Sequence, residues 1–283
     1  MRQVAYGLVL FTVLASTACA DGNAVSPATL KLLKTFDAEF VLIEPGKGRF
    51  PATFELGSKK GPEQEQPAVT ITLTEPFAIG KYEVPQNLYE AVMGNNPSRW
   101  KGVRNSVEMM TFPEALEFCE RTTKLMRQAN LLGEDEEIRL PSEVEWEYCC
   151  RAGTTTAYSF GDAAQGPDDA GKKATLLDPY AWHTGNAAGN DPPVGALKPN
   201  PWGLYDMHGY LWEFCRDDFI ESYESIATTG AKPRLRKNGD ACVIRGGSWK
   251  DEFVYLRSAA RRGFNHAGKD DAIGFRCVKA KVD

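Results

Sequence analysis

The second half of this 283-residue chain carries almost no periodicity of apolar residues. From about residue 151 onward, Gly-, Pro- and Asn-rich stretches such as residues 185–193 dominate, and these residue types interrupt helices and strands. No repeat, low-complexity tract or linker divides the chain. The pattern predicts one domain with few strands and long ordered loops. The side chains best suited to anchor such loops are those of Trp182, Trp202, Trp212 and Trp249.

The first half has clearer periodic signals. Residues 40–43 form an apolar run, and residues 69–74 alternate apolar and hydroxyl-bearing side chains, with a polar loop between the two segments. Alternation of this kind is typical of a half-buried strand. Pro85 then opens a helical pattern of apolar residues that stops at Gly94, as expected for a helix start and a C-cap.

Two further helices are predicted from capping boxes. Thr111 stands three residues before Glu114, and Ser142 stands three residues before Glu145; each pair can satisfy amide groups at a helix N-terminus. The first helix presents one apolar face that includes Phe118 and Cys119 and extends to about residue 129. The second extends to about residue 150. We assign the acidic residues at its start to the cap and the helix dipole: Glu143, Glu145 and Glu147.

The N-terminus has the pattern of a targeting segment. A positive charge at Arg2 precedes a short, mostly apolar run over residues 4–15, and small residues at 18–20 form a cleavage signal. The apolar run is short for a membrane span. We therefore expect export to the periplasm or the cell exterior. A lipoprotein signal with Cys19 as the lipidated residue is the alternative, and only that modification would attach the protein to a membrane.

This pattern divides the chain into a signal peptide over residues 1–20, a leader segment over 21–37 and one domain over 38–281. The formal net charge is −5, and no long basic run is present, which argues against a nucleic-acid partner. Six cysteines follow Cys19. An even number in an oxidising compartment indicates disulfides, and six cysteines allow 15 pairings.

Candidate metal and redox sites are weak. The histidines lack the paired spacing of metal ligands on a helix, so we expect each to be a surface or hydrogen-bonding residue: His183, His208 and His266. Cys149 and Cys150 are adjacent, without the two-residue spacer of the familiar redox motifs. We assign no metal ligand from these patterns.

Several ordered blocks of the chain resemble one known family. They lie at residues 40–46, 77–84, 139–148, 200–209, 243–249 and 273–277. Together they resemble the formylglycine-generating enzyme family, also called the sulfatase-modifying factor family, over about residues 39–280. The resemblance implies a C-type-lectin-like α+β fold with small sheets, few helices and much irregular structure.

The metal chemistry of that family is not matched. Its copper-binding members carry two cysteines between the Gly-Gly-Ser and Ala-Ala-Arg segments, whereas residues 250–257 contain no sulfur. Asp251 and Phe253 lie roughly where the thiolates are expected, and Cu(I) requires soft ligands. We therefore expect a member without copper. Tyr210 stands where the family has an asparagine that helps to hold calcium. Because a phenol oxygen is a poor ligand for a hard cation, we keep calcium only as an alternative.

The resemblance also implies a cleft and a disulfide framework. The candidate cleft residues are Arg245, Ser248, Trp249, Asp251 and Arg261. Ser248 matches an active-site serine of the family. The alternative for the two arginines is an internal salt bridge. The resemblance implies a disulfide between Cys119 and Cys277; Cys150 lacks its family partner, and Cys215 is the next choice for it.

Taken together, these features favour an exported member without copper that binds a peptide, protein or glycan partner in the family's cleft. A formylglycine-generating oxidase acting on a sulfatase cysteine is the first alternative, because the rest of the framework is intact and Cys149 or Cys242 could approach the cleft. A scaffold subunit of a cell-surface assembly is the second alternative. Whether the protein is an enzyme is left open by the sequence.

Overall fold

A computed structural model of the protein describes residues 25–188, 191–224, 226, 228–235, 239 and 241–282. The expected signal peptide lies outside these residues. The helices and short 3-10 helices are α1 (Pro27–Ala38), η1 (Glu63–Glu65), α2 (Gln86–Met93), α3 (Phe112–Gln128), α4 (Glu143–Arg151) and η2 (Phe253–Leu256).

The strands are short and form small sheets. They are β1 (Phe40–Ile43), β2 (Thr53–Leu56), β3 (Val69–Thr72), β4 (Phe77–Gly80), β5 (Glu136–Arg139), β6 (Trp212–Asp218), β7 (Ala241–Arg245), β8 (Arg261–Asn265), β9 (Ile273–Gly274) and β10 (Val278–Lys281). Within the described residues, the strand orders are β1-β4-β10-β5, β2-β3 and β8-β7-β6-β9. Only the β6–β9 pair is parallel among these ladders.

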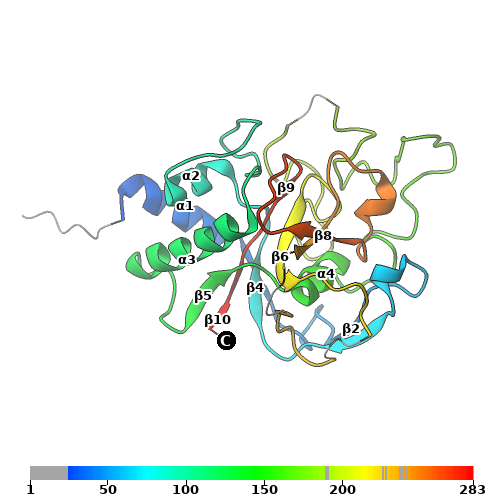
Figure 1. Ribbon diagram of the computed structural model, residues 1–283, viewed down its shortest axis with the longest axis horizontal. Helices are drawn as coiled ribbons and strands as arrows, with labels where there is room; N and C mark the ends of the chain where they lie inside the picture. Colours follow the sequence, from blue (N-terminus) through cyan, green and yellow to red (C-terminus); the bar gives the residue numbers. More distant parts are fainter. Residues whose placement is uncertain are drawn as a thin grey trace, which may run out of the picture.

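The last strand of the chain joins segments that are far apart in sequence. Val278 of β10 is in register with Ile79 of β4 on one side and with Arg139 of β5 on the other. Figure 1 shows β10 between these two strands, and α1, α2 and α3 gathered at one end of the molecule. The C-terminal strand is thereby the central link between two strands of the N-terminal half of the chain.

Both predicted capping boxes are confirmed. At the start of α3, the Thr111 side chain accepts the Glu114 N–H, and the Glu114 carboxylate accepts the Thr111 N–H at 2.7 Å. At the start of α4, the Ser142 side chain accepts the Glu145 N–H, and the Glu145 carboxylate accepts the Ser142 N–H at 2.8 Å. The α2 helix ends at Gly94, whose φ of +82° favours glycine.

The expected leader segment contains a helix, α1, for which no prediction was made from the sequence. α1 starts after Ser26, whose side chain accepts the Thr29 N–H, and it buries Leu33 and Phe36. Both side chains belong to the same core cluster as α2 and α3, so this segment packs as part of the domain. In the part of the chain that the structure describes, no helix is long and apolar enough to cross a bilayer.

The long loops of the second half are held by buried aromatic side chains. Trp202 packs edge-on against Phe50 and Tyr148, with ring centroids 4.8 Å apart in both pairs. Trp202 and Trp212 are buried, whereas Trp182 and Trp249 are half-buried. The predicted anchoring role therefore fits the first two best, and Trp249 remains accessible at the surface of the domain.

Candidate functional site

A cavity of about 310 Å³ lies where five irregular segments meet. They are the connection between α2 and α3, the loop around residue 187, the turn before β6 and the loops beside Trp249 and Asp271. Its walls are formed by Trp100, Ser106, Glu108, Ala187, Ala188, Asp191, Tyr210, Leu211, Trp249 and Asp271. The lining combines two indoles with three carboxylates, which is the mixture of apolar wall and few polar groups expected of a ligand site.

Unusual backbone conformations bring Trp249 and Tyr210 to this cavity. Gly246 and Gly247 follow β7 with φ of +101° and +74°, which only glycine adopts without strain. A Cβ on Gly247 would lie 2.7 Å from the Tyr255 carbonyl oxygen, so the bend also requires the missing side chain. Tyr210 has φ of +79°, and its hydroxyl donates to the Pro192 carbonyl at 2.7 Å.

The structure brings three of the five predicted cleft residues together. Trp249 lines the cavity. Ser248 is buried beside it, and its hydroxyl donates to Asp251 Oδ2 at 2.5 Å. The same carboxylate accepts the Trp212 Nε1–H at 2.8 Å and pairs with Arg262. Ser248 and Asp251 therefore support the loop that carries Trp249, and their polar groups are already engaged.

Arg245 and Arg261 lie in the interior, away from the cavity. Arg245 is fully buried, pairs with Glu147 and donates to the Ala259 carbonyl at 2.9 Å. Arg261 is 1 % exposed and donates from Nε to Glu143 Oε1 at 2.6 Å. The internal salt bridge is therefore the arrangement that the structure gives both arginines.

These ion pairs also correct the role assigned to the acidic residues of α4. Only Glu145 acts in the cap, whereas Glu143 and Glu147 are fully buried and accept from arginines. Neither of these two acts in the cap, although Glu143 lies in the first turn of α4, as expected for a dipole residue. Glu147 pairs with Arg151 on the same helix, but the other arginine partners, Arg245 and Arg261, lie on strands about 100 residues further along the chain. Local spacing carries no signal for such contacts.

Sequence reasoning missed the acidic lining of the cavity. Glu108, Asp191 and Asp271 lie on separate loops without periodic pattern, so nothing in local spacing places them together. The one available signal was an indole at Trp100 within a polar, Gly- and Asn-containing loop, where a large apolar side chain has no local reason to be exposed.

The three carboxylates differ in their electrostatic surroundings. Burial raises the pKa of Glu108 to about 7, although the backbone N–H groups of Trp100 and Arg99 oppose this. Burial also raises the pKa of Asp191. For Asp271 the effect of burial is outweighed by Lys250 and Arg99, which hold its pKa below its usual range. One carboxylate is thus neutralised by cations, whereas the other two are desolvated.

The residues present do not fit the family's copper site. Asp251 is engaged with Ser248 and Trp212, and Phe253 has no donor atom. Cys149 and Cys242 are buried in different core clusters, and neither lines the cavity. No pair of thiolates is therefore available in the described residues where Cu(I) chemistry would need one.

The fit to calcium is equally poor. The Tyr210 hydroxyl is hydrogen-bonded to the Pro192 carbonyl and to Asp191. The nearby Glu213 carboxylate accepts from Arg276 on both oxygens and from the Trp146 Nε1–H. No group of three or more His, Cys, Asp or Glu side chains arranged for a metal ion occurs in the described parts of the chain.

The positions of the cysteines differ between the two expected disulfides, Cys119–Cys277 and Cys150–Cys215. Cys119 Sγ and Cys277 Sγ lie 3.9 Å apart between α3 and the last strand, both as buried thiols. Cys150 Sγ lies 3.4 Å from the Met207 carbonyl and 3.8 Å from His208 Nδ1. Cys215 is a buried thiol on β6. The first pair is positioned for oxidation, whereas the contacts of Cys150 are to other groups.

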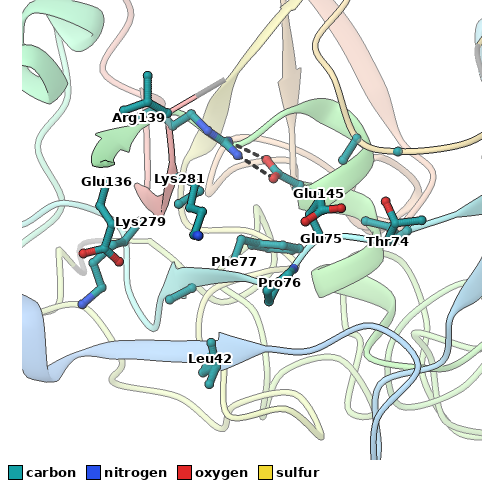
Figure 2. A pocket seen from close by; sticks show the side chains of 16 residues that line it. Leu42, Thr74, Glu75, Pro76, Phe77, Glu136, Arg139, Glu145, Lys279 and Lys281 are labelled. Atoms are coloured by element: carbon teal, nitrogen blue, oxygen red, sulfur yellow. Dashed lines mark hydrogen bonds and ion pairs between the residues drawn. The ribbon is translucent and has the colours of Figure 1, made fainter. Parts of the chain in front are cut away.

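A larger hollow of about 530 Å³ lies over the sheet that contains β4 and β10. Figure 2 shows Leu42 and Phe77 among its apolar lining and the Arg139–Glu145 ion pair on one side. In this pair Arg139 Nη1 and Nη2 donate to the Glu145 carboxylate at 2.7 Å and 2.8 Å. Lys279 is paired with Asp37 at 2.7 Å. Because these charges are paired within the protein, this hollow is a weaker candidate than the cavity beside Trp249.

Comparison with solved structures identifies the fold class. The structure of PvdO from Pseudomonas aeruginosa superimposes with a TM-score of 0.70 at 24% identity, covering 86% of this chain and 94% of that one. Together with the small mixed sheets and abundant irregular structure, this likeness defines a C-type-lectin-like α+β domain. The predicted fold class is confirmed.

The sequence comparisons define the family. The model of the sulfatase-modifying factor enzyme 1-like domain matches residues 31–281, so the chain belongs to the formylglycine-generating enzyme family. It is 30% identical over 260 residues to the chaperone protein LppX of Paenibacillus barcinonensis, covering 80% of this chain and 88% of that one. It is 32% identical over 155 residues to the formylglycine-generating enzyme of Mycobacterium tuberculosis, covering 51% of this chain and 52% of the enzyme. The chain thus matches about half the length of the enzyme.

Proposed function

We propose that this protein is an exported family member without copper that binds a segment of a partner polypeptide in the cavity beside Trp249. The observation that carries the proposal is the lining itself: two indoles and desolvated carboxylates meet in a cavity, and no thiolate pair of the described residues reaches it. Indoles that line a recess are frequent energetic anchors of protein interfaces. One relative, of which this chain covers 88%, is named a chaperone, which favours a polypeptide over a glycan.

Replacing Trp249 by alanine is expected to weaken polypeptide binding at least tenfold, because truncation removes an anchor from the cavity wall. The measurement is the dissociation constant for a fluorescent, reduced and carboxymethylated polypeptide used as a general unfolded probe. The matched control is Tyr255→Ala, which removes an aromatic side chain that is 43% exposed and does not line the cavity. Equal losses in both variants would contradict binding in the cavity.

Two further measurements distinguish the alternatives: capture of partners and mass spectrometry of a peptide substrate. A scaffold subunit would retain its partners through another surface, so Trp249→Ala would leave its captured partners unchanged. An oxidase would convert the thiol of a sulfatase-motif peptide to an aldehyde when supplied with Cu(I), oxygen and a reductant. Mass spectrometry detects that conversion, and its appearance would overturn the proposal in favour of catalysis.

We further propose that export allows Cys119 and Cys277 to form a disulfide. Peptide mapping of the native protein without reduction is expected to recover the two cysteine-containing peptides joined. Reduction is expected to lower the free energy of unfolding by about 2–5 kcal/mol, because the bridge closes a long loop in the unfolded chain. The control is the double variant Cys119→Ala with Cys277→Ala, whose stability should be insensitive to the reductant. A free Cys119 in the native protein would contradict the proposal.

A further inference from the structure

Resting on the proposed polypeptide binding, we propose that the cavity is a subsite for a basic side chain. It takes the ammonium group of a lysine or the guanidinium group of an arginine from the bound segment, with Glu108 as the charged acceptor and Trp100 and Trp249 as apolar walls. The proposal names the chemical class of residue that the cavity selects.

One carboxylate oxygen of Glu108, Oε2, accepts no hydrogen bond from the described residues. The side chain is 3% exposed, and its Oε1 accepts the Trp100 N–H at 2.9 Å. Its Oε2 is buried and has no hydrogen-bond partner among the residues that the structure describes. The backbone is held as well, because the Glu108 N–H donates to Ser98 Oγ at 3.1 Å. A buried acceptor left unpaired destabilises the free protein, and a donor on a ligand relieves this.

Asp191 adds a second carboxylate without a cation. It accepts from the Asn105 amide at 2.5 Å and from the Tyr210 hydroxyl at 3.2 Å, both of which are neutral donors. Within the described residues, neither Asp191 nor Glu108 forms an ion pair. Two partly desolvated carboxylates in one cavity disfavour an anionic ligand and favour a cation.

The cations at the rim are already engaged. Arg99 Nη1 lies 3.0 Å from Asp271 Oδ2, and Lys250 Nζ lies 2.8 Å from Asp270 Oδ1 and also contacts Asp271. Arg99 lies over the Trp100 ring at 4.9 Å, and Lys250 lies over the Trp249 ring at 5.3 Å. The protein therefore uses its own cations on Asp271 and leaves Glu108 and Asp191 for a ligand.

The size and walls of the cavity suit a basic side chain. A volume of about 310 Å³ is at the lower end for small-molecule sites and is suited to one side chain rather than a large ligand. Indole rings attract a nearby cation and pack well against the alkyl stem of lysine or arginine. A metal ion is disfavoured, because the described residues provide no cluster of three suitable ligands.

The proposal predicts a pH dependence with a definite sign. Burial raises the pKa of Glu108 to about 7, so much of this carboxyl is protonated and neutral at pH 6. The groups that face it are Asp191, Asp271 and Tyr210, with Arg99 and Lys250 at the rim. Because the charged carboxylate binds the cation, affinity should rise on the order of tenfold from pH 6 to pH 8.

The test uses calorimetry with small probes that carry one side chain each. They are the Nα-acetyl N-methylamides of lysine, arginine, norleucine and glutamate. The lysine and arginine probes are expected to bind at least tenfold more tightly than the norleucine probe, and the glutamate probe is expected not to bind. Glu108→Gln, which keeps the shape and removes the charge, is expected to lower the preference for the basic probes at least fivefold and to remove most of its pH dependence. Glu117→Gln is the control, because Glu117 is an exposed residue of α3.

Each outcome bears on the subsite separately from the proposed function. Equal affinity for the lysine and norleucine probes overturns the subsite, even if the unfolded polypeptide still binds in a Trp249-dependent manner. A cation preference without polypeptide binding supports the subsite and contradicts the proposed function. If Glu108→Gln lowers the melting temperature too far, Asp191→Asn should still weaken the lysine probe severalfold and spare the norleucine probe. Calcium that displaces the lysine probe competitively at micromolar concentration overturns the proposal in favour of a metal site.

Discussion

Replacing Glu143 by glutamine is expected to lower the free energy of unfolding by about 3–5 kcal/mol, because it removes one partner of a buried ion-pair network. Glu143 is fully buried and pairs with Arg261, Arg245 and Arg234. Its Oε1 also accepts from the Tyr223 hydroxyl at 2.8 Å. Arg245 and Arg234 would keep Glu147 and Asp217 as partners, but the neutral amide would leave the buried Arg261 guanidinium without a carboxylate among the described residues. Equilibrium unfolding in urea measures the loss.

The control for this prediction is Glu117→Gln. Glu117 forms an exposed pair with Arg121 on α3, and such pairs contribute about 0–1 kcal/mol. The comparison therefore separates the effect of burial from the effect of losing a carboxylate. A loss below 1 kcal/mol in Glu143→Gln would mean that the network does not stabilise the fold.

The same residue gives the protein a defined acid sensitivity. Burial alone would raise the pKa of Glu143, but Arg261, Arg245 and Arg234 outweigh it and lower the pKa to about 2. Since the folded-state pKa lies below the unfolded value, this carboxylate contributes stability above about pH 4.5. That contribution is lost as the pH falls toward 2. Glu143→Gln should flatten this part of the stability profile.

Replacing Phe118 by alanine is expected to lower the free energy of unfolding by about 3–5 kcal/mol, because the cavity left in the core cannot be filled by small movements. Phe118 is fully buried on α3. Its ring is stacked on that of Tyr89 at 5.4 Å and lies edge-on to Phe275 at 5.3 Å between centroids. It therefore joins α2, α3 and the C-terminal segment.

The graded control for this core position is Phe118→Leu, which retains most of the apolar volume and should be affected much less. Urea unfolding of both variants, with the m-value checked for two-state behaviour, gives the difference. If leucine and alanine destabilise the protein equally, the loss comes from the aromatic contacts and not from the missing volume.

The sequence alone was sufficient for features that depend on neighbouring residues. The capping boxes at Thr111 and Ser142 and the helix end at Gly94 were predicted correctly, because each depends on hydrogen bonds or backbone angles within a few residues. The family membership was recognisable as well, since its sequence blocks occur in order along the chain. The absence of sulfur between residues 250 and 257 is likewise a property of the sequence.

Only the tertiary structure decided which charged residues are buried together and which line the cavity. Glu143 is about 100 residues away in sequence from its partners Arg245 and Arg261. Glu108, Asp191 and Asp271 lie on separate loops without periodic pattern and come together only in the folded domain. Desolvation and ion pairing depend on the neighbours that packing supplies. The sequence around a charged residue therefore does not show whether the residue is buried without a partner or buried in an ion pair. The same type of side chain therefore has two roles: Glu143 forms ion pairs in the core, and Glu108 lines the cavity as the proposed acceptor for a basic side chain.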